Sequence, residues 1–163
     1  MTTPSTPIGS GAAPADLTFV HPPRITPEKF EAVLRAANSP AAPHAAKLYQ
    51  IPLEYGLDPA IALAFFGHES SFGKKGKAVQ TLNWGNLRKG QGHALRTSGG
   101  WAWYDSWEDS LRDWCLLIKK KYVESWNRPT VRRALELYAP VNDNNKPSRY
   151  ADAVMQMVAG WQV

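Results

Sequence analysis

The chain has 163 residues, a length that suits one domain with a sizeable core. Its hydrophobic fraction of 44% and charged fraction of 20% are typical of a globular protein, and no apolar run approaches the ~20 residues of a membrane span, so we expect no membrane partner. The net charge of +5 favours an anionic partner, but Lys and Arg form a run only at 119–121, which does not favour a nucleic-acid binder.

The first part of the chain is poor in large apolar residues. Residues 1–22 are rich in Thr, Ser, Pro, Gly and Ala, so we expect a flexible tail or linker there, followed by one domain over 23–163. Thr26 as an N-cap and Pro27 in the first turn predict the first helix. A second helix is expected over about 43–55, kinked or interrupted by Pro52.

The most apolar helix is predicted next. Asp58 followed by Pro59 is a helix start signal, the run behind it is apolar on every face, as in a buried central helix, and Gly73 is its expected end. The helical period then disappears. Segments 94–97 and 101–104 flank a Ser-Gly-Gly turn and predict a β-hairpin.

Helical patterning returns after the predicted hairpin. Ser106 and Asp109 have the spacing of a capping box at the start of a helix, and two shorter helices are expected over about 130–138 and 148–161. The sequence therefore predicts a mainly α (α+β) fold in which helices flank a small β-hairpin lobe.

Glu69 is the residue whose position needs an explanation. It lies four residues after Phe65 and eight after Ile61, on the apolar side of the buried helix and near its C-terminal end. Desolvation and the negative end of the helix dipole both raise its pKa. An acid that stays protonated near neutral pH is what glycosidic bond cleavage needs. The alternative is a structural salt bridge with Arg88 or Lys74.

Other chemistries find less support. His68-Glu69 begins a zinc-protease motif, but the second histidine would stand where Phe72 is, so we predict no metal and no cofactor. Cys115 is the only cysteine, so no internal disulfide forms, and its apolar helical surroundings indicate a buried, inert thiol.

Aromatic and amide side chains gather in the lobe. Flat rings suit sugar stacking and amides suit sugar hydroxyl and acetamido groups, whereas core packing and turn formation are the alternatives. The candidate substrate-binding residues of this kind are Asn83, Trp84, Asn86, Trp101, Trp103 and Tyr104.

Four segments in order resemble one known family. Residues 68–73 (HESSFG), 83–88 (NWGNLR), 104–106 (YDS) and 138–145 (YAPVNDNN), the last followed by Tyr150, resemble the glucosaminidase family of the lysozyme-like superfamily over roughly residues 25–161. The resemblance implies a lysozyme-like domain with a cleft between helices and lobe. It aligns Glu69 with the catalytic acid and places Tyr150 beside it, with Ser70 and Asp143 among the substrate-binding residues.

The implied substrate is peptidoglycan, the alternating polymer of N-acetylglucosamine and N-acetylmuramic acid, cut after N-acetylglucosamine. One departure from the family concerns a second carboxylate, because no Asp or Glu occurs between Ser70 and Tyr104. We take Asp105 as the candidate for the second catalytic carboxylate, and Glu108, Asp109 and Asp143 are the alternatives to it. Otherwise the substrate's own acetamido group attacks the anomeric carbon.

Several alternatives remain open from the sequence. They are a muramidase, a lytic transglycosylase that leaves an anhydro-sugar, a non-catalytic peptidoglycan-binding module, and a nucleic-acid binder motivated by charge alone. No secretory signal is visible at the start of the chain. We expect a monomer that acts at the bacterial cell wall, outside the cytoplasm, delivered by a phage, a secretion apparatus or a longer parent protein.

Overall fold

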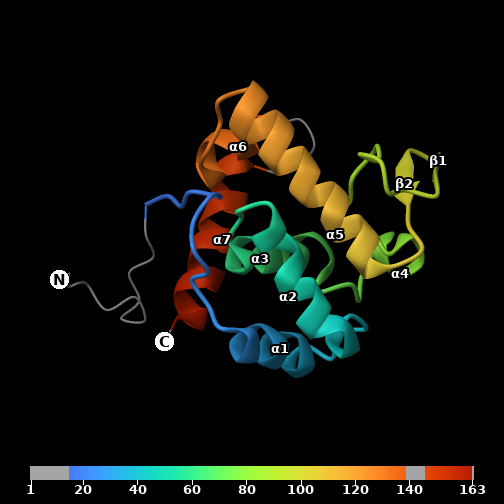
Figure 1. Cartoon of the computed structure of the whole chain (residues 1–163), viewed down its shortest axis with the longest axis horizontal. Coiled ribbons are helices and arrows are strands. Elements are labelled where there is room, and N and C mark those ends of the chain that lie inside the picture. Colours follow the sequence, from blue (N-terminus) through green and yellow to red (C-terminus); the bar gives the residue numbers. More distant parts are fainter. Residues whose placement is uncertain (1–14, 139–145, 163) are drawn as a thin grey trace.

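The computed structural model describes residues 15–138 and 146–162 (Figure 1). The helices gather around α3, and a small hairpin projects beside one end of α5 (Figure 1). This confirms the predicted mainly α fold with a β-hairpin lobe. In chain order the elements are α1 (Pro27–Ala36), the 3-10 helix η2 (Ala42–His44), α2 (Ala45–Glu54), α3 (Pro59–Ser70), α4 (Ala78–Thr81), β1 (Arg96–Ser98), β2 (Trp101–Trp103), α5 (Trp107–Leu116), the π-helix η3 (Leu117–Ser125), α6 (Val131–Tyr138) and α7 (Pro147–Trp161).

The packed domain begins before α1. Leu17 and Phe19 are buried in the core, while the residues between and after them face outward, the alternation of an extended strand. Isolated bridges join Thr18 with Thr130 and Val20 with Leu57. The prediction of a flexible tail over 1–22 is therefore wrong for residues 17–20, because the side chains of Leu17 and Phe19 attach this extended segment to the core.

Side-chain caps fix the starts of three helices as the sequence predicts. The side chains of Thr26, Asp58 and Ser106 accept hydrogen bonds from backbone amides at the starts of α1, α3 and α5. Asp58 is buried and also pairs with Arg24 at 2.7 Å, which ties the segment before α1 to α3. The start of α3, and with it the register of Glu69, is thus fixed by local interactions.

α3 is the buried central helix. It packs against α7 and α2 (Figure 1), and its residues 59–66 are all buried. It ends at Ser70 rather than at Gly73, because the backbone turns left-handed at Ser71 and stays so through Phe72 and Gly73. That turn folds the Phe72 ring back onto Gly67, where a Cβ would stand only 2.6 Å from the ring.

Two further expectations need adjustment. α2 runs through Pro52 and ends two residues later at Glu54, because a proline in the last turn breaks little of the hydrogen-bond ladder. The 3-10 helix η2 precedes α2, where the sequence predicted one longer α-helix. Among the described residues, the short α4 was not predicted. The hairpin has the register Arg96 opposite Trp103, and positive φ at Gly99 and Gly100 closes it.

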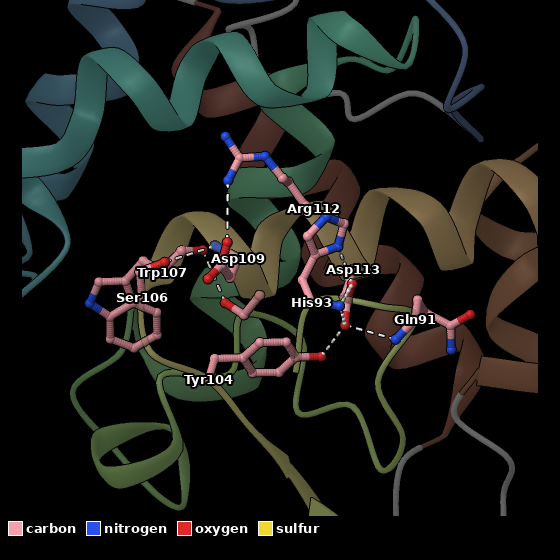
Figure 2. Close-up of polar contacts among 9 residues, drawn as sticks. Gln91, His93, Tyr104, Ser106, Trp107, Asp109, Arg112 and Asp113 are labelled. Carbon is pink, nitrogen blue, oxygen red and sulfur yellow. Dashed lines mark hydrogen bonds and ion pairs between the residues drawn. The ribbon is translucent and has the colours of Figure 1, made fainter. Parts of the chain in front are cut away.

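A buried carboxylate anchors the lobe to α5 (Figure 2). Asp113 is fully buried and accepts hydrogen bonds from the backbone amides of Gln91 (2.7 Å) and His93 (3.0 Å). It also accepts the Tyr104 hydroxyl at 2.9 Å and lies 2.7 Å from Nδ1 of the His93 ring. One side chain therefore holds both the loop before β1 and the residue that follows β2.

Candidate active site

A cavity of about 520 Å³ lies between the helices and the lobe. Residues from the end of α3, the turn after α4, strand β2, η3 and α6 form its wall, so helices and lobe both contribute. Its size is that of a pocket for a small organic ligand or a few sugar rings. The lining residues are His68, Glu69, Gly85, Asn86, Leu87, Arg88, Trp101, Leu117, Tyr122 and Tyr138.

The Glu69 carboxyl group lies in the cavity wall at the penultimate residue of α3. Burial raises its pKa above the usual value, and hydrogen bonds from Tyr150 and Asn86 offset part of that shift. Among the described residues, no cation lies within ion-pair distance of Glu69, so the alternative of a salt bridge with Arg88 or Lys74 is wrong. Burial outweighs the two hydrogen bonds and no cation opposes it, so the net effect favours the protonated form.

Tyr150 supports the carboxyl group from α7. Its side chain is buried, and its hydroxyl donates to Oε2 of Glu69 at 2.6 Å. Its ring packs against those of Phe65 and His68, with centroids 5.3 Å and 3.9 Å away. Burial raises the pKa of Tyr150, so its hydroxyl keeps its proton and remains a donor.

Asn86 holds the other carboxyl oxygen. Its Nδ2 donates to Oε1 and to the backbone carbonyl of Glu69, both at 3.1 Å. The residue has a φ of +53°, a left-handed conformation that asparagine tolerates better than most residues. The adjacent turn is fixed by the buried Asn83, which bonds the amide and the carbonyl of Leu87, each at 2.8 Å.

The family model for glucosaminidases, described as mannosyl-glycoprotein endo-beta-N-acetylglucosaminidase, matches residues 42–162, well over half of the chain. The chain belongs to the glucosaminidase family. It is a lysozyme-like glycoside hydrolase domain that acts on the glycan strands of peptidoglycan, which confirms the family and the enzyme class inferred from the motifs. The search of the curated proteins and the search of the solved structures each found no match.

The glucosaminidase fold brings four of the candidate site residues together. Glu69, Asn86 and Trp101 line the cavity, and Tyr150 reaches Glu69 from behind it. Asp143 lies outside the described residues.

The other candidates do not reach the cavity wall. Trp84 is buried, stacks on Phe66 and donates its Nε1 hydrogen to the carbonyl of Ala62. The remaining ones cap a turn, fix the lobe or face solvent: Ser70 and Asn83 bond backbone groups, Tyr104 bonds Asp113, Trp103 stacks with Arg96, and Asp105 is exposed.

Several cavity residues, Arg88, Tyr122 and Tyr138 among them, were not predicted as parts of the site. Tyr122 and Tyr138 lie on the apolar stripes of their helices, so the periodicity indicates core residues. The one signal that could have separated Tyr138 is its place at the start of the family segment 138–145. The Tyr138 hydroxyl donates to the carbonyl of Gly85 at 2.8 Å, which joins α6 to the turn that carries Asn86. Arg88 had been considered only as a salt-bridge partner.

Two further features of the glucosaminidase domain bear on its chemistry. Within residues 15–138 and 146–162, no three His, Cys, Asp or Glu side chains gather in a way that could hold a metal ion. In the same ranges, no helix is long and apolar enough to cross a bilayer. Cys115 is buried, as predicted, and burial raises the pKa of its thiol.

Tyr150→Phe is expected to move the alkaline limb of the pH–rate profile to higher pH. The Tyr150 hydroxyl lowers the pKa of Glu69 by favouring its ionised form, so removing the hydroxyl raises that pKa further. If Glu69 is the general acid that the sequence predicts, it is active while protonated. Activity then persists to higher pH, although turnover falls because the carboxyl is less well positioned. Measuring kcat/KM against pH for both proteins checks this, and a limb that moves to lower pH would contradict it.

Proposed function

We propose that Glu69 is the general acid with which this domain cuts glycan strands in the manner of an endo-β-N-acetylglucosaminidase. The observation that carries the proposal is the carboxyl group in the cavity wall, whose pKa burial raises and whose two oxygens accept hydrogen bonds from neutral donors. Each oxygen keeps a second lone-pair position, so a proton carried there is available to a glycosidic oxygen in the cavity.

The first chemical step breaks the bond between the anomeric carbon and the glycosidic oxygen. Glu69 gives its proton to that oxygen, the strand beyond it leaves as an alcohol, and positive charge develops on the anomeric carbon. The electron-rich Glu69 carboxylate that remains stays hydrogen-bonded to Tyr150 and Asn86.

The second step needs a nucleophile at the anomeric carbon. Among the described lining residues Glu69 is the only carboxylic acid, and the candidate Asp105 is exposed at the end of β2. This favours the acetamido route, in which the carbonyl oxygen of the substrate's own N-acetyl group bonds to the anomeric carbon. Water then attacks that carbon as the bond to the acetamido oxygen breaks and the N-acetyl group re-forms. The water gives one proton to the Glu69 carboxylate, which restores the acid and releases a reducing N-acetylglucosamine end.

The proposal needs one copy of the chain, because a single copy supplies the acid, its two hydrogen-bond donors and the cavity wall. We further propose that it acts at the bacterial cell wall, where its substrate lies, after delivery by a phage, a secretion apparatus or a longer parent protein. No nucleic acid takes part in this chemistry.

Mass spectrometry of digested peptidoglycan tests the proposal. We expect fragments that have gained one water and carry N-acetylglucosamine at the new reducing end. Fragments ending in N-acetylmuramic acid would indicate a muramidase, and an anhydro end would indicate a lytic transglycosylase. Binding without any cleavage from acid to mildly alkaline pH would overturn the proposal in favour of a non-catalytic module.

A further inference from the structure

Arg88 gives the cavity a fixed positive charge. Among the described lining residues it is the only Arg or Lys. Its guanidinium carbon lies 4.1 Å from the centroid of the Trp101 ring, and both side chains line the cavity that contains Glu69. Stacking on an aromatic face occupies one face of a guanidinium and leaves the N–H groups at its edge available to an acceptor.

The backbone that carries Arg88 is held firmly. The preceding residue, Leu87, has its amide and carbonyl bonded by Asn83, and its carbonyl also accepts the amide of Ala102 at 3.0 Å. Trp101 is the neighbour of Ala102 in β2. The arginine and the ring beneath it are thus positioned by the same short set of hydrogen bonds.

The guanidinium of Arg88 has no carboxylate partner among the described residues, whereas Arg24 and Arg128 pair with acids at 2.7 Å and 2.6 Å. Arg88 also does not pair with Glu69, which would hold that acid in its ionised form. A positive charge kept in a substrate cavity but away from the catalytic acid is suited to an anionic group of the substrate itself.

We propose that Arg88, supported by Trp101, binds a carboxylate carried by the N-acetylmuramic acid side of the glycan and thereby selects peptidoglycan over neutral N-acetylglucosamine polymers. N-acetylglucosamine has no charge, whereas muramic acid carries a lactyl carboxylate, or a stem peptide with carboxylates where that group is amide-linked. A guanidinium binds a carboxylate through two parallel N–H bonds, which gives both affinity and orientation. The inference rests on the proposed function, since it assigns a substrate group to the same cavity.

Binding measurements in the Glu69→Gln background test this without turnover. Three ligands are compared: glycan strands freed of stem peptides, the same strands with their lactyl carboxylates amidated, and strands that keep their stem peptides. Arg88→Gln should weaken binding of a carboxylate-bearing ligand by roughly fivefold to tenfold and leave binding of the amidated strands unchanged. A loss with peptide-free strands identifies the lactyl carboxylate, and a loss only with peptide-bearing strands identifies the peptide.

Arg96→Gln is the matched control. Arg96 stacks on Trp103 with its guanidinium carbon 4.7 Å from the ring centroid, in the same hairpin, but neither residue lines the cavity. Arg96→Gln removes one positive charge, as Arg88→Gln does, but it should leave the affinities for all three ligands unchanged. Each of three results would overturn the proposal. Both variants could weaken binding equally, Arg88→Gln could weaken the binding of charged and amidated strands equally, or it could weaken no binding at all.

The two proposals fail in different assays. Release of reducing ends by the Glu69→Gln single variant would overturn the role of Glu69 and leave the role of Arg88 standing. If Arg88→Gln changed the affinities for carboxylate-bearing and amidated strands equally, the carboxylate site would be overturned and the role of Glu69 as general acid would stand.

Discussion

Glu69→Gln is expected to lower the rate of glycan cleavage by roughly 10²- to 10⁴-fold, the usual contribution of a positioned general acid. Glutamine keeps the size of the side chain. Its oxygen can accept from Asn86 while its NH₂ group donates to the Tyr150 hydroxyl, since the two residues contact different oxygens of Glu69, but it has no acidic proton to give to a leaving alcohol. Release of reducing ends from purified peptidoglycan, measured at substrate saturation, checks the loss.

The same variant is expected to unfold at an equal or higher temperature at neutral pH. The pKa of Glu69 is raised in the folded state. Its contribution to stability is therefore fully present below the unfolded-state pKa and is lost as the pH rises through the folded-state pKa. Glutamine does not ionise, so the variant should gain stability relative to the parent protein as the pH rises through that range.

Thermal unfolding at acid and neutral pH separates a catalytic role from a structural one. Glu108→Gln is a suitable control, because Glu108 pairs with the exposed His44 and does not line the cavity. It should keep its activity. Retained cleavage by Glu69→Gln, or a loss of activity matched by a loss of fold, would remove the basis for the assignment.

Local chemistry explains which parts of the fold were predictable. The helix starts at Thr26, Asp58 and Ser106 depend on a side chain that bonds an amide two or three residues away, and the hairpin depends on two adjacent glycines. Glu69 was predictable for the same reason, because its burial follows from the register of one apolar helix that begins at a clear cap. Asn86 was a candidate because of its amide group, but its contact with Glu69 could not be predicted.

Long-range contacts account for what the sequence did not predict. Trp84 and Trp101 look alike in the sequence, yet one is buried against Phe66 while the other lines the cavity. Tyr138 reaches the site from α6 through a bond to Gly85. Asp113 was not singled out from the sequence, since the groups that it binds are 9 to 22 residues away along the chain.

Asp113→Asn is expected to lower the free energy of unfolding by about 2–4 kcal/mol, the range for disrupting a buried carboxylate network. The two carboxylate oxygens accept from the amides of Gln91 and His93 and from the Tyr104 hydroxyl. Each oxygen faces a backbone N–H, so whichever one becomes the NH₂ group of asparagine places a donor against a donor (Figure 2). Because the side chain keeps its size, the loss reports hydrogen bonding and not a new void.

Urea unfolding measures the loss, and amide hydrogen exchange at Gln91 and His93 locates it. Asp109→Asn is the control on the same helix, since its carboxylate is partly exposed and lies 3.4 Å from Arg112, and it should cost less than about 1 kcal/mol. Two links join this anchor to catalysis: Tyr104 follows β2, and β2 carries Trp101 at the cavity. A variant that loses stability should therefore also bind glycan more weakly, whereas unchanged stability would show that the carboxylate does not hold the lobe.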